Sequence, residues 1–198
     1  MKLDLVYDIQ QSYRKVLNCM SRPGLIENIN EQSEKIDIYT NFYSSTLLLM
    51  FMLLDAEVNF YIVTEDESEI KKIVNQLSYA KSTDIKDADF IFILNDARAE
   101  QIEEAFLNAK TGTLMDPQKS ATIIFETKGL KNEEGLILKG PGIKDEAYAK
   151  IDAKSNWINY RDKKNIEYPL GIDIIFVDVD SNIMCLPRTT KVEKQVVK

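Results

Sequence analysis

Apolar positions recur along the chain with two different periods, which predict different elements. Spacing of three and four residues predicts a helix over residues 9–20 with one apolar face, made of Ile9, Tyr13, Val16, Leu17 and Met20. Asp8 stands just before this run and is the expected N-cap. The nearly continuous apolar stretch at residues 42–55 predicts a second helix that is buried on all sides.

Short apolar runs then alternate with helical segments through the middle of the chain. Strands are expected at residues 58–63, 90–94 and 121–125, and helices at residues 64–77 and 98–108. Such alternation is typical of a mainly parallel sheet covered by helices on both faces. The pattern therefore predicts an α/β fold with three αβα layers.

The last third of the chain has a different pattern. A strand is expected at residues 134–139 and a helix at residues 145–162, which carries the only tryptophan, Trp157. Strands at residues 172–177 and 183–186, joined by a polar turn, predict a C-terminal antiparallel β-hairpin. Without internal repeats or a linker, residues 1–190 are expected to form one domain, followed by a polar tail at residues 191–198.

Charge and segment length narrow the class of protein. The formal net charge is -7, which disfavours binding to nucleic acid or to an anionic membrane surface. The longest apolar run covers residues 46–54, whereas a bilayer-spanning helix needs about 20 apolar residues. No apolar signal core follows the N-terminal residues. We therefore expect a cytoplasmic protein with no nucleic-acid or membrane partner.

The chain contains no histidine, and this limits its chemistry. Ser-His-Asp and Cys-His catalysis are excluded, and the commonest metal ligand is missing. Cys19 and Cys185 are far apart in sequence and are expected to be reduced thiols rather than a metal cluster. The sequence predicts no catalytic set, no metal site and no cofactor.

Turns rich in glycine and proline are the first candidates for function. They occur at residues 21–24, at Gly140, Pro141 and Gly142, and at residues 168–171. Proline followed by glycine predicts a type II turn at Pro23 and Gly24, with a positive φ at the glycine. None has the spacing of a phosphate-binding loop, so each could also simply end an element.

Three charged residues lie beside these turns or within the hairpin. Arg22 and Arg188 each adjoin a proline, and either could capture a phosphate or carboxylate or form an ordinary ion pair. Asp173 lies inside an apolar strand, where an unpaired charge is costly, so it needs a partner such as Arg188 or a backbone donor. An aspartate can also pair with the ring nitrogen of pyridoxal phosphate, although no matching lysine motif is evident.

Taken together and in order, these motifs resemble a known family. They are the segments 8–14, 20–24, 140–143, 168–173 and 186–190, of which the last contains Pro187, Arg188 and Thr189. The set resembles the H-subunit family of the bacterial carbon–phosphorus lyase system for phosphonate use. The likeness covers nearly the whole chain, but residues 25–135 match only in pattern.

The resemblance implies a fold similar to the large domain of pyridoxal-phosphate-dependent transferases, without the cofactor site. It implies a homodimer and a core complex with subunits G, I and J. With subunits G, I and L, the family supports transfer of ribose triphosphate from ATP to methylphosphonate with release of adenine, while subunit J later breaks the carbon–phosphorus bond.

Two functions from different classes remain open at this point. The first is an accessory subunit without chemistry of its own, whose binding or interface residues would be Arg22, Pro23, Gly24, Gly140, Pro141, Gly142, Asp173, Pro187, Arg188 and Thr189. The alternative is a stand-alone enzyme, dependent on pyridoxal phosphate or acting on phosphoesters, that uses Asp173, Arg22 and Arg188.

Overall fold

The protein folds into alternating helices and strands, seen in a computed structural model that describes residues 2–65 and 67–195, without the side chains of 67–69. The elements are α1 (Tyr7–Ser21), β1 (Ile26–Asn28), α2 (Asn30–Ser33), α3 (Ser44–Leu53), β2 (Asn59–Val63), α4 (Glu67–Ser78), β3 (Lys81–Ser82), η1 (Ile85–Asp87), β4 (Phe90–Ile93), α5 (Ala99–Asn108), η2 (Pro117–Lys119), β5 (Thr122–Glu126), β6 (Leu130–Lys139), β7 (Ala147–Ile151), α6 (Trp157–Lys164), β8 (Asp173–Val177), β9 (Asn182–Leu186) and β10 (Lys191–Lys194).

The main sheet has seven strands in the order β1-β9-β8-β5-β4-β2-β3. Strands β3, β2, β4, β5 and β8 pair in parallel, whereas β9 pairs antiparallel with both β8 and β1. The predicted α/β class, mainly parallel sheet and C-terminal hairpin are therefore confirmed. The hairpin strands β8 and β9 lie inside the sheet, because β1 adds outside β9.

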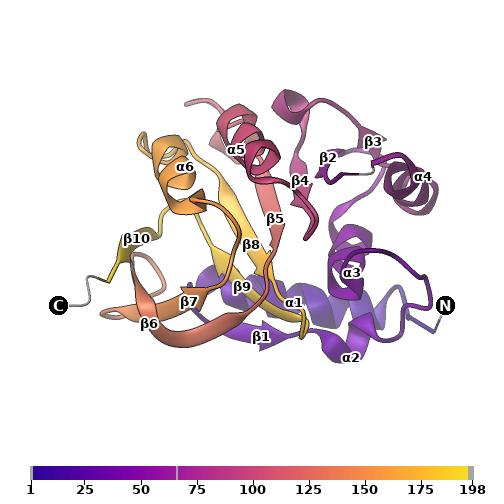
Figure 1. Cartoon of the computed structure of the whole chain (residues 1–198), viewed down its shortest axis with the longest axis horizontal. Coiled ribbons are helices and arrows are strands. Elements are labelled where there is room, and N and C mark those ends of the chain that lie inside the picture. The colour runs from indigo at the N-terminus through magenta and orange to yellow at the C-terminus, as the bar shows by residue number, and fades with distance from the viewer. Residues whose placement is uncertain (1, 66, 196–198) are drawn as a thin grey trace.

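Successive residues of the central strands point to opposite faces of the sheet and enter two separate cores. In β8, Ile174 and Phe176 pack with α5 and α6, whereas Ile175 and Val177 pack with α1 and α3. Figure 1 shows the helices distributed on both sides of the sheet in this way. Burial on both faces explains why these strands read as continuous apolar runs.

A second, three-stranded antiparallel sheet lies beside α6 in the order β10-β6-β7 (Figure 1). Its inner side chains, among them Leu138, Ala149 and Val192, join the core that contains α5 and α6. The small sheet therefore continues the cover of one face of the main sheet. The sequence pattern predicted only part of β6 and neither of its partners.

The position of α1 is predicted correctly, but its cap and its buried face are not. The Asp4 carboxylate accepts the Val6 and Tyr7 N–H groups at 2.8 and 2.9 Å, while Asp8 lies within the helix. Of the expected face, Val16 is buried and Ile9 and Met20 pack against the core, but Tyr13 and Leu17 are nearly half exposed. Asp8, Ser12 and Cys19 are buried in their place.

Satisfied polar groups explain this rotation of α1. Ser12 donates to the Asp8 carbonyl oxygen at 2.9 Å, and Lys35 pairs with the Asp8 carboxylate at 2.7 Å. Because these groups have partners, small polar side chains can be buried where the pattern favours large apolar ones.

The helix expected at residues 145–162 is wrong over its first half. Residues 147–151 form β7, which pairs with β6, and the helix α6 covers only Trp157–Lys164. Alanine and lysine favour a helix locally, but pairing with β6 buries Ala149 completely and decides the conformation. Four residues of the expected tail also form a strand, β10, while residues 196–198 lie outside the described part.

Among the residues that the structure describes, no helix has both the length and the apolar character needed to cross a bilayer.

Candidate functional site

The glycine- and proline-rich motifs fold into tight turns that lie against one another, and we call them the turn cluster: residues 21–24, 140–142, 168–171 and 187–190. The N–H of Leu25 bonds the Arg22 carbonyl oxygen, that of Ile143 bonds Gly140, and that of Thr190 bonds Pro187. Gly24 has φ +91°, so the predicted type II turn is confirmed. Motifs from both ends and from the middle of the chain thus meet in space.

Two glycines make the close approach of these turns possible. A Cβ atom on Gly142 would lie 2.1 Å from the Ser21 carbonyl oxygen, and one on Gly140 would lie 2.9 Å from that of Thr189. Their φ angles are +84° and +140°, which residues with side chains rarely adopt. The middle turn therefore packs backbone against backbone between the N-terminal turn and the C-terminal one.

Arg188 and Asp173 form an ion pair on the same side of the molecule. The Arg188 Nη2 atom lies 2.5 Å from Asp173 Oδ2, and the backbone N–H of Arg188 donates to Oδ1 at 2.7 Å. Arg188 also donates to the carbonyl oxygen of Pro117 at 2.8 Å and to the Ser120 hydroxyl. The expectation that Asp173 meets Arg188 or a backbone donor is confirmed, because Asp173 binds both the guanidinium and the backbone N–H of Arg188. Both side chains therefore already have partners within the chain.

Arg22 lies apart from that ion pair. It is exposed, its guanidinium contacts the Asn18 amide, and it lines a shallow hollow with Asn132, Gly142 and Ile143. Arg188 lines a different hollow, next to Thr189. The three residues of the stand-alone enzyme hypothesis are therefore not gathered in one site.

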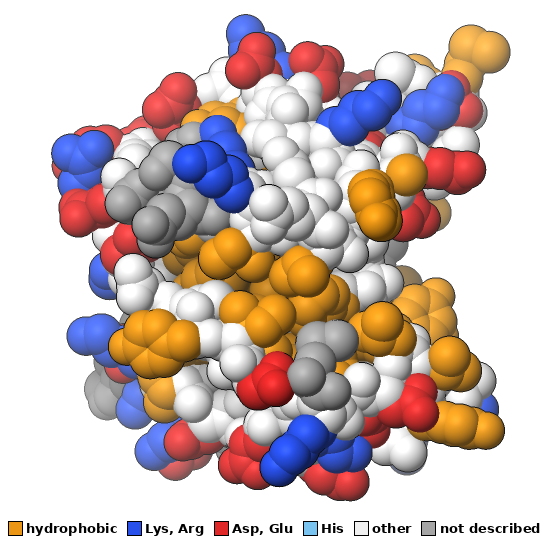
Figure 2. Space-filling view, turned by 90° about the vertical axis from the view of Figure 1, so that its right-hand side faces the viewer, with side chains coloured by type: hydrophobic (Ala, Val, Ile, Leu, Met, Phe, Trp, Pro, Cys, Tyr) orange, Lys and Arg blue, Asp and Glu red, His pale blue; other side chains and the backbone are white. Residues whose placement is uncertain are grey.

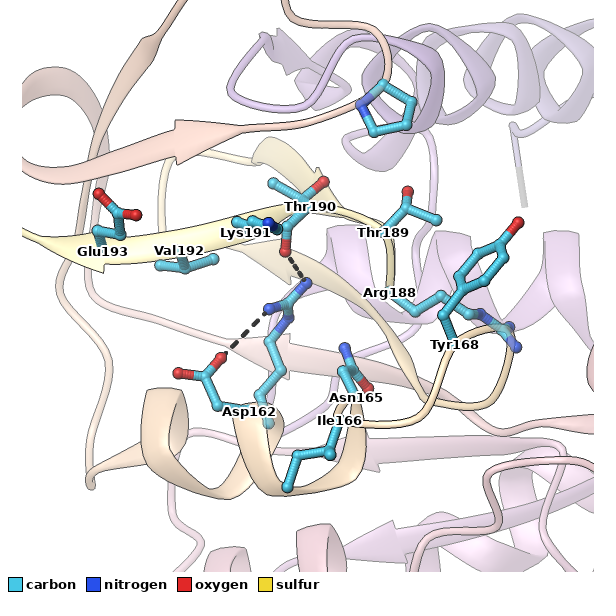
Figure 3. Close-up of a pocket in the computed structure, with 12 residues that line it drawn as sticks. Asp162, Asn165, Ile166, Tyr168, Arg188, Thr189, Thr190, Lys191, Val192 and Glu193 are labelled. Atoms are coloured by element: carbon cyan, nitrogen blue, oxygen red, sulfur yellow. Dashed lines mark hydrogen bonds and ion pairs between the residues drawn. The ribbon is translucent and has the colours of Figure 1, made fainter.

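The larger hollow is a cavity of about 670 Å³ between α6 and the segment 188–193 (Figure 3). Besides Arg188 and Thr189, its walls include Pro141 from the middle turn and Tyr168 from the third motif. The cavity thus adjoins the turn cluster, and it combines polar and apolar walls. No motif in the sequence indicates this cavity.

Arg161 in α6 is a residue that the sequence analysis missed. Only 1% of it is exposed, and its Nη2 atom donates to the carbonyl oxygens of Pro187 and Thr190 at 2.7 and 2.8 Å. It thereby fixes the C-terminal turn. Its neighbours in the sequence are polar, so the pattern alone suggests a solvated helix face.

Glu126 is a second residue that was missed. It ends β5, and 3% of it is exposed. Burial raises the pKa of its carboxyl, although the Thr46 hydroxyl, the Tyr43 N–H and the Asn95 N–H all donate to it, at 2.6, 2.9 and 2.9 Å. These bonds join the start of α3 to β4 and β5. An acid at the carboxyl end of a parallel strand was the available signal.

No metal-ligand cluster of histidine, cysteine, aspartate or glutamate occurs among the described residues. Cys19 and Cys185 are both free and buried, on facing surfaces of α1 and β9. Burial raises the pKa of the Cys185 thiol, with a further contribution from the neighbouring Cys19. The Cys185 thiol is therefore a protonated core group rather than a nucleophile.

One face of the molecule gathers apolar side chains. Figure 2 shows such side chains gathered on the face that carries α3 and α4. A shallow pocket is lined by Tyr39, Phe42 and Ile70. Tyr39 is 93% exposed, and Leu77 on α4 is 41% exposed. Exposed apolar patches of this kind are typical of surfaces that contact other proteins.

Known proteins match this chain over nearly its whole length. Residues 3–193 match the family described as bacterial phosphonate metabolism protein (PhnH). The chain is 26% identical over 195 residues to the alpha-D-ribose 1-methylphosphonate 5-triphosphate synthase subunit PhnH of Rhizobium meliloti (strain 1021), covering 97% of this chain and 94% of that protein. It is 24% identical over 188 residues to the putative C-P lyase subunit protein HtxG of Stutzerimonas stutzeri, covering 92% and 85%.

The matched region includes α1, both sheets and every turn of the turn cluster. The resemblance that rests on those turns is therefore confirmed, and the chain belongs to the PhnH family of bacterial phosphonate metabolism proteins.

Proposed function

We propose that this chain is an accessory subunit of a carbon–phosphorus lyase complex in the bacterial cytoplasm. In that complex it supports transfer of ribose 5-triphosphate from ATP to an alkylphosphonate, with release of adenine, and it carries no activity of its own. The proposed partners are subunits G, I and J, together with a second copy of the same chain. The names of the relatives support this role, because both are subunits of such systems.

One structural observation supports the accessory role most directly. Arg188 is the charged residue of the family's terminal motif. Its N–H groups donate to Asp173, Pro117 and Ser120 of the same chain. The motif therefore ties the C-terminal turn to β8 and to residues 117–120 rather than presenting groups to a reacting substrate. A rigid surface of this kind suits a subunit that positions its partners.

The same ion pair bears on the expected relation to pyridoxal-phosphate-dependent transferases. We propose that the main sheet corresponds to the large domain of those enzymes but has no cofactor site. Asp173, the residue that would have to pair with a pyridine nitrogen, is already bound by Arg188. Because breaking such a pair leaves a half-buried charge, cofactor binding there is disfavoured.

The test is co-expression with subunits G, I and J, followed by gel filtration of the tagged complex. We expect the chain to elute with its partners and to remain with them in moderate salt. Elution as a separate species, with the partners assembled without it, would contradict the proposal.

Matched arginine variants test whether the turn cluster is part of the interface. Arg14 in α1 and Arg22 just after it are both exposed, but only Arg22 belongs to the turn cluster. We expect Arg22→Ala to weaken co-elution and Arg14→Ala to leave it unchanged. Equal behaviour of the two variants would remove the turn cluster from the interface.

A further inference from the structure

The apolar face of α1 is wider than the part that its own chain covers. One side of the helix packs against β9, α3 and β1. Residues three or four apart share a strip of a helix, and here that strip, which we call the α1 stripe, consists of Val6, Ile9, Tyr13, Leu17 and Met20. Val6, Tyr13 and Leu17 are 69%, 46% and 48% exposed. An exposed apolar strip of this kind is typical of a surface that another protein covers.

The spacing of the α1 stripe is the same in both directions along the helix. Tyr13 is its midpoint, because Ile9 and Leu17 lie four residues to either side of it. Val6 and Met20 lie seven residues to either side. An antiparallel α1 of a second copy, with both Tyr13 side chains at the centre, would therefore bring Leu17 of each copy to Ile9 of the other. A two-fold axis requires such a self-complementary surface.

Opposite charges lie beyond the two ends of the stripe. Asp4 precedes Tyr13 by nine residues and Arg22 follows it by nine. Both are exposed, and neither forms an ion pair with the residues that the structure describes. In the antiparallel arrangement, Asp4 of each copy lies at the end that carries Arg22 of the other, whereas a parallel arrangement would bring like charges together. The charges are therefore complementary to a second copy of the same helix.

We propose that a second copy of this chain docks on the α1 stripe, with the two α1 helices antiparallel about a two-fold axis at Tyr13. The proposal deepens the proposed function and rests on it for the presence of a second copy. Burial of the apolar stripe supplies the driving force for association, and the two end charges fix the orientation.

Sedimentation equilibrium of the full chain over a range of concentrations tests the surface. We expect a monomer–dimer equilibrium, and Leu17→Lys should raise its dissociation constant at least about tenfold, because it buries a charge in the apolar contact. The matched control is Leu107→Lys on α5, since Leu107 is 46% exposed and lies outside the stripe. Both side chains are exposed, so both variants keep the fold. Unchanged association of Leu17→Lys, or an equal loss in Leu107→Lys, would overturn the proposal.

A double-mutant cycle tests the antiparallel orientation. Asp4→Asn keeps a side-chain oxygen for the N–H groups of Val6 and Tyr7 but removes the charge. We expect Asp4→Asn and Arg22→Gln each to weaken dimerisation about fivefold. The double variant should be no weaker than either single one, because each change already removes both ion pairs. Losses that multiply in the double variant would contradict this orientation.

Failure of this pairing can be distinguished from failure of the proposed function. A natural chain that sediments as a monomer but elutes with subunits G, I and J would overturn the pairing and leave the accessory role in place. If Leu17→Lys then also lost co-elution, the α1 stripe would belong to a contact with a different subunit, and the second copy would be the wrong occupant.

Discussion

At the scale of single residues, the charged groups near the turn cluster act mainly on their own chain. Arg188 joins β8, η2 and the turn after β9, and Arg161 joins α6 to that turn. Side chains that connect several segments in this way contribute to stability through several hydrogen bonds at once. Removing one of them should therefore lower the free energy of unfolding of the whole chain.

The first prediction concerns Arg188→Met, which removes the guanidinium from the partly buried Asp173 carboxylate and leaves it only the backbone N–H of residue 188. Because the two side chains are only 16% and 19% exposed, we expect the free energy of unfolding to fall by about 3 kcal/mol. Urea unfolding measures it through the fluorescence of Trp157, whose ring lies 4.8 Å from that of Phe176. The exposed Arg22→Met should change stability by less than about 0.5 kcal/mol. Equal losses in the two variants would contradict this role for Arg188.

The second prediction concerns Glu126 and pH. Because burial raises the pKa of its carboxyl, the folded state binds this proton more tightly than the unfolded state does. The contribution of Glu126 to stability therefore falls as the pH rises from the ordinary glutamate range through the folded pKa. We expect Glu126→Gln to flatten that fall when unfolding is followed at a series of pH values. The exposed Glu133→Gln should keep it, and an unchanged slope in Glu126→Gln would refute the assignment.

Residues differ in how far the sequence reveals them. Asp173 was predictable, because a charge inside an apolar strand needs a partner. Arg161 was not, because polar neighbours conceal its burial, and neither was Glu126, whose donors come from segments distant in sequence.

At the scale of elements, the turn cluster depends on backbone contacts that only glycine permits. The third prediction is that Gly142→Ala lowers the free energy of unfolding by at least about 2 kcal/mol, because its φ is +84° and its Cβ would meet the Ser21 carbonyl oxygen. Gly129→Ala is the control, since no atom lies within 4 Å of its added Cβ. Thermal unfolding compares them, and similar melting temperatures would argue against a close-packed turn.

The fourth prediction tests β10, which the sequence pattern assigned to a polar tail. Val192 packs into the core and is 9% exposed, so Val192→Ser should cost about 1–2 kcal/mol. Glu193 on the same strand is exposed, and Glu193→Ser should have little effect. Urea unfolding distinguishes them, and an equally small effect of both would mean that β10 does not stabilise the fold.

The predicted elements were most accurate for strands that are buried on both faces of the sheet. Residues 90–94 and 121–125 were recognisable as strands because both of their faces are covered. Residues 147–151 were not, because their alternation is weak and their local preference is helical. Only pairing with β6 makes them a strand, and such pairing between distant segments is not visible in a local pattern.

At the scale of the whole molecule, the alternation of strands and helices was sufficient to predict a mainly parallel sheet, but not its edge strands β1 and β3 or its strand order. The ordered turns were sufficient to predict the family. What the pattern could not give was the small second sheet and the cavity beside it, which arise when β10 returns to β6. The apolar face over α3 and α4 and the turn cluster are the surfaces on which we expect partner subunits to bind.

The most direct test of the accessory role is adenine release from ATP in the presence of methylphosphonate, measured with the partner subunits with and without this chain. We expect release only when the chain is present with its partners, and none from the isolated chain. Equal rates without the chain, or release by the isolated chain, would contradict the account.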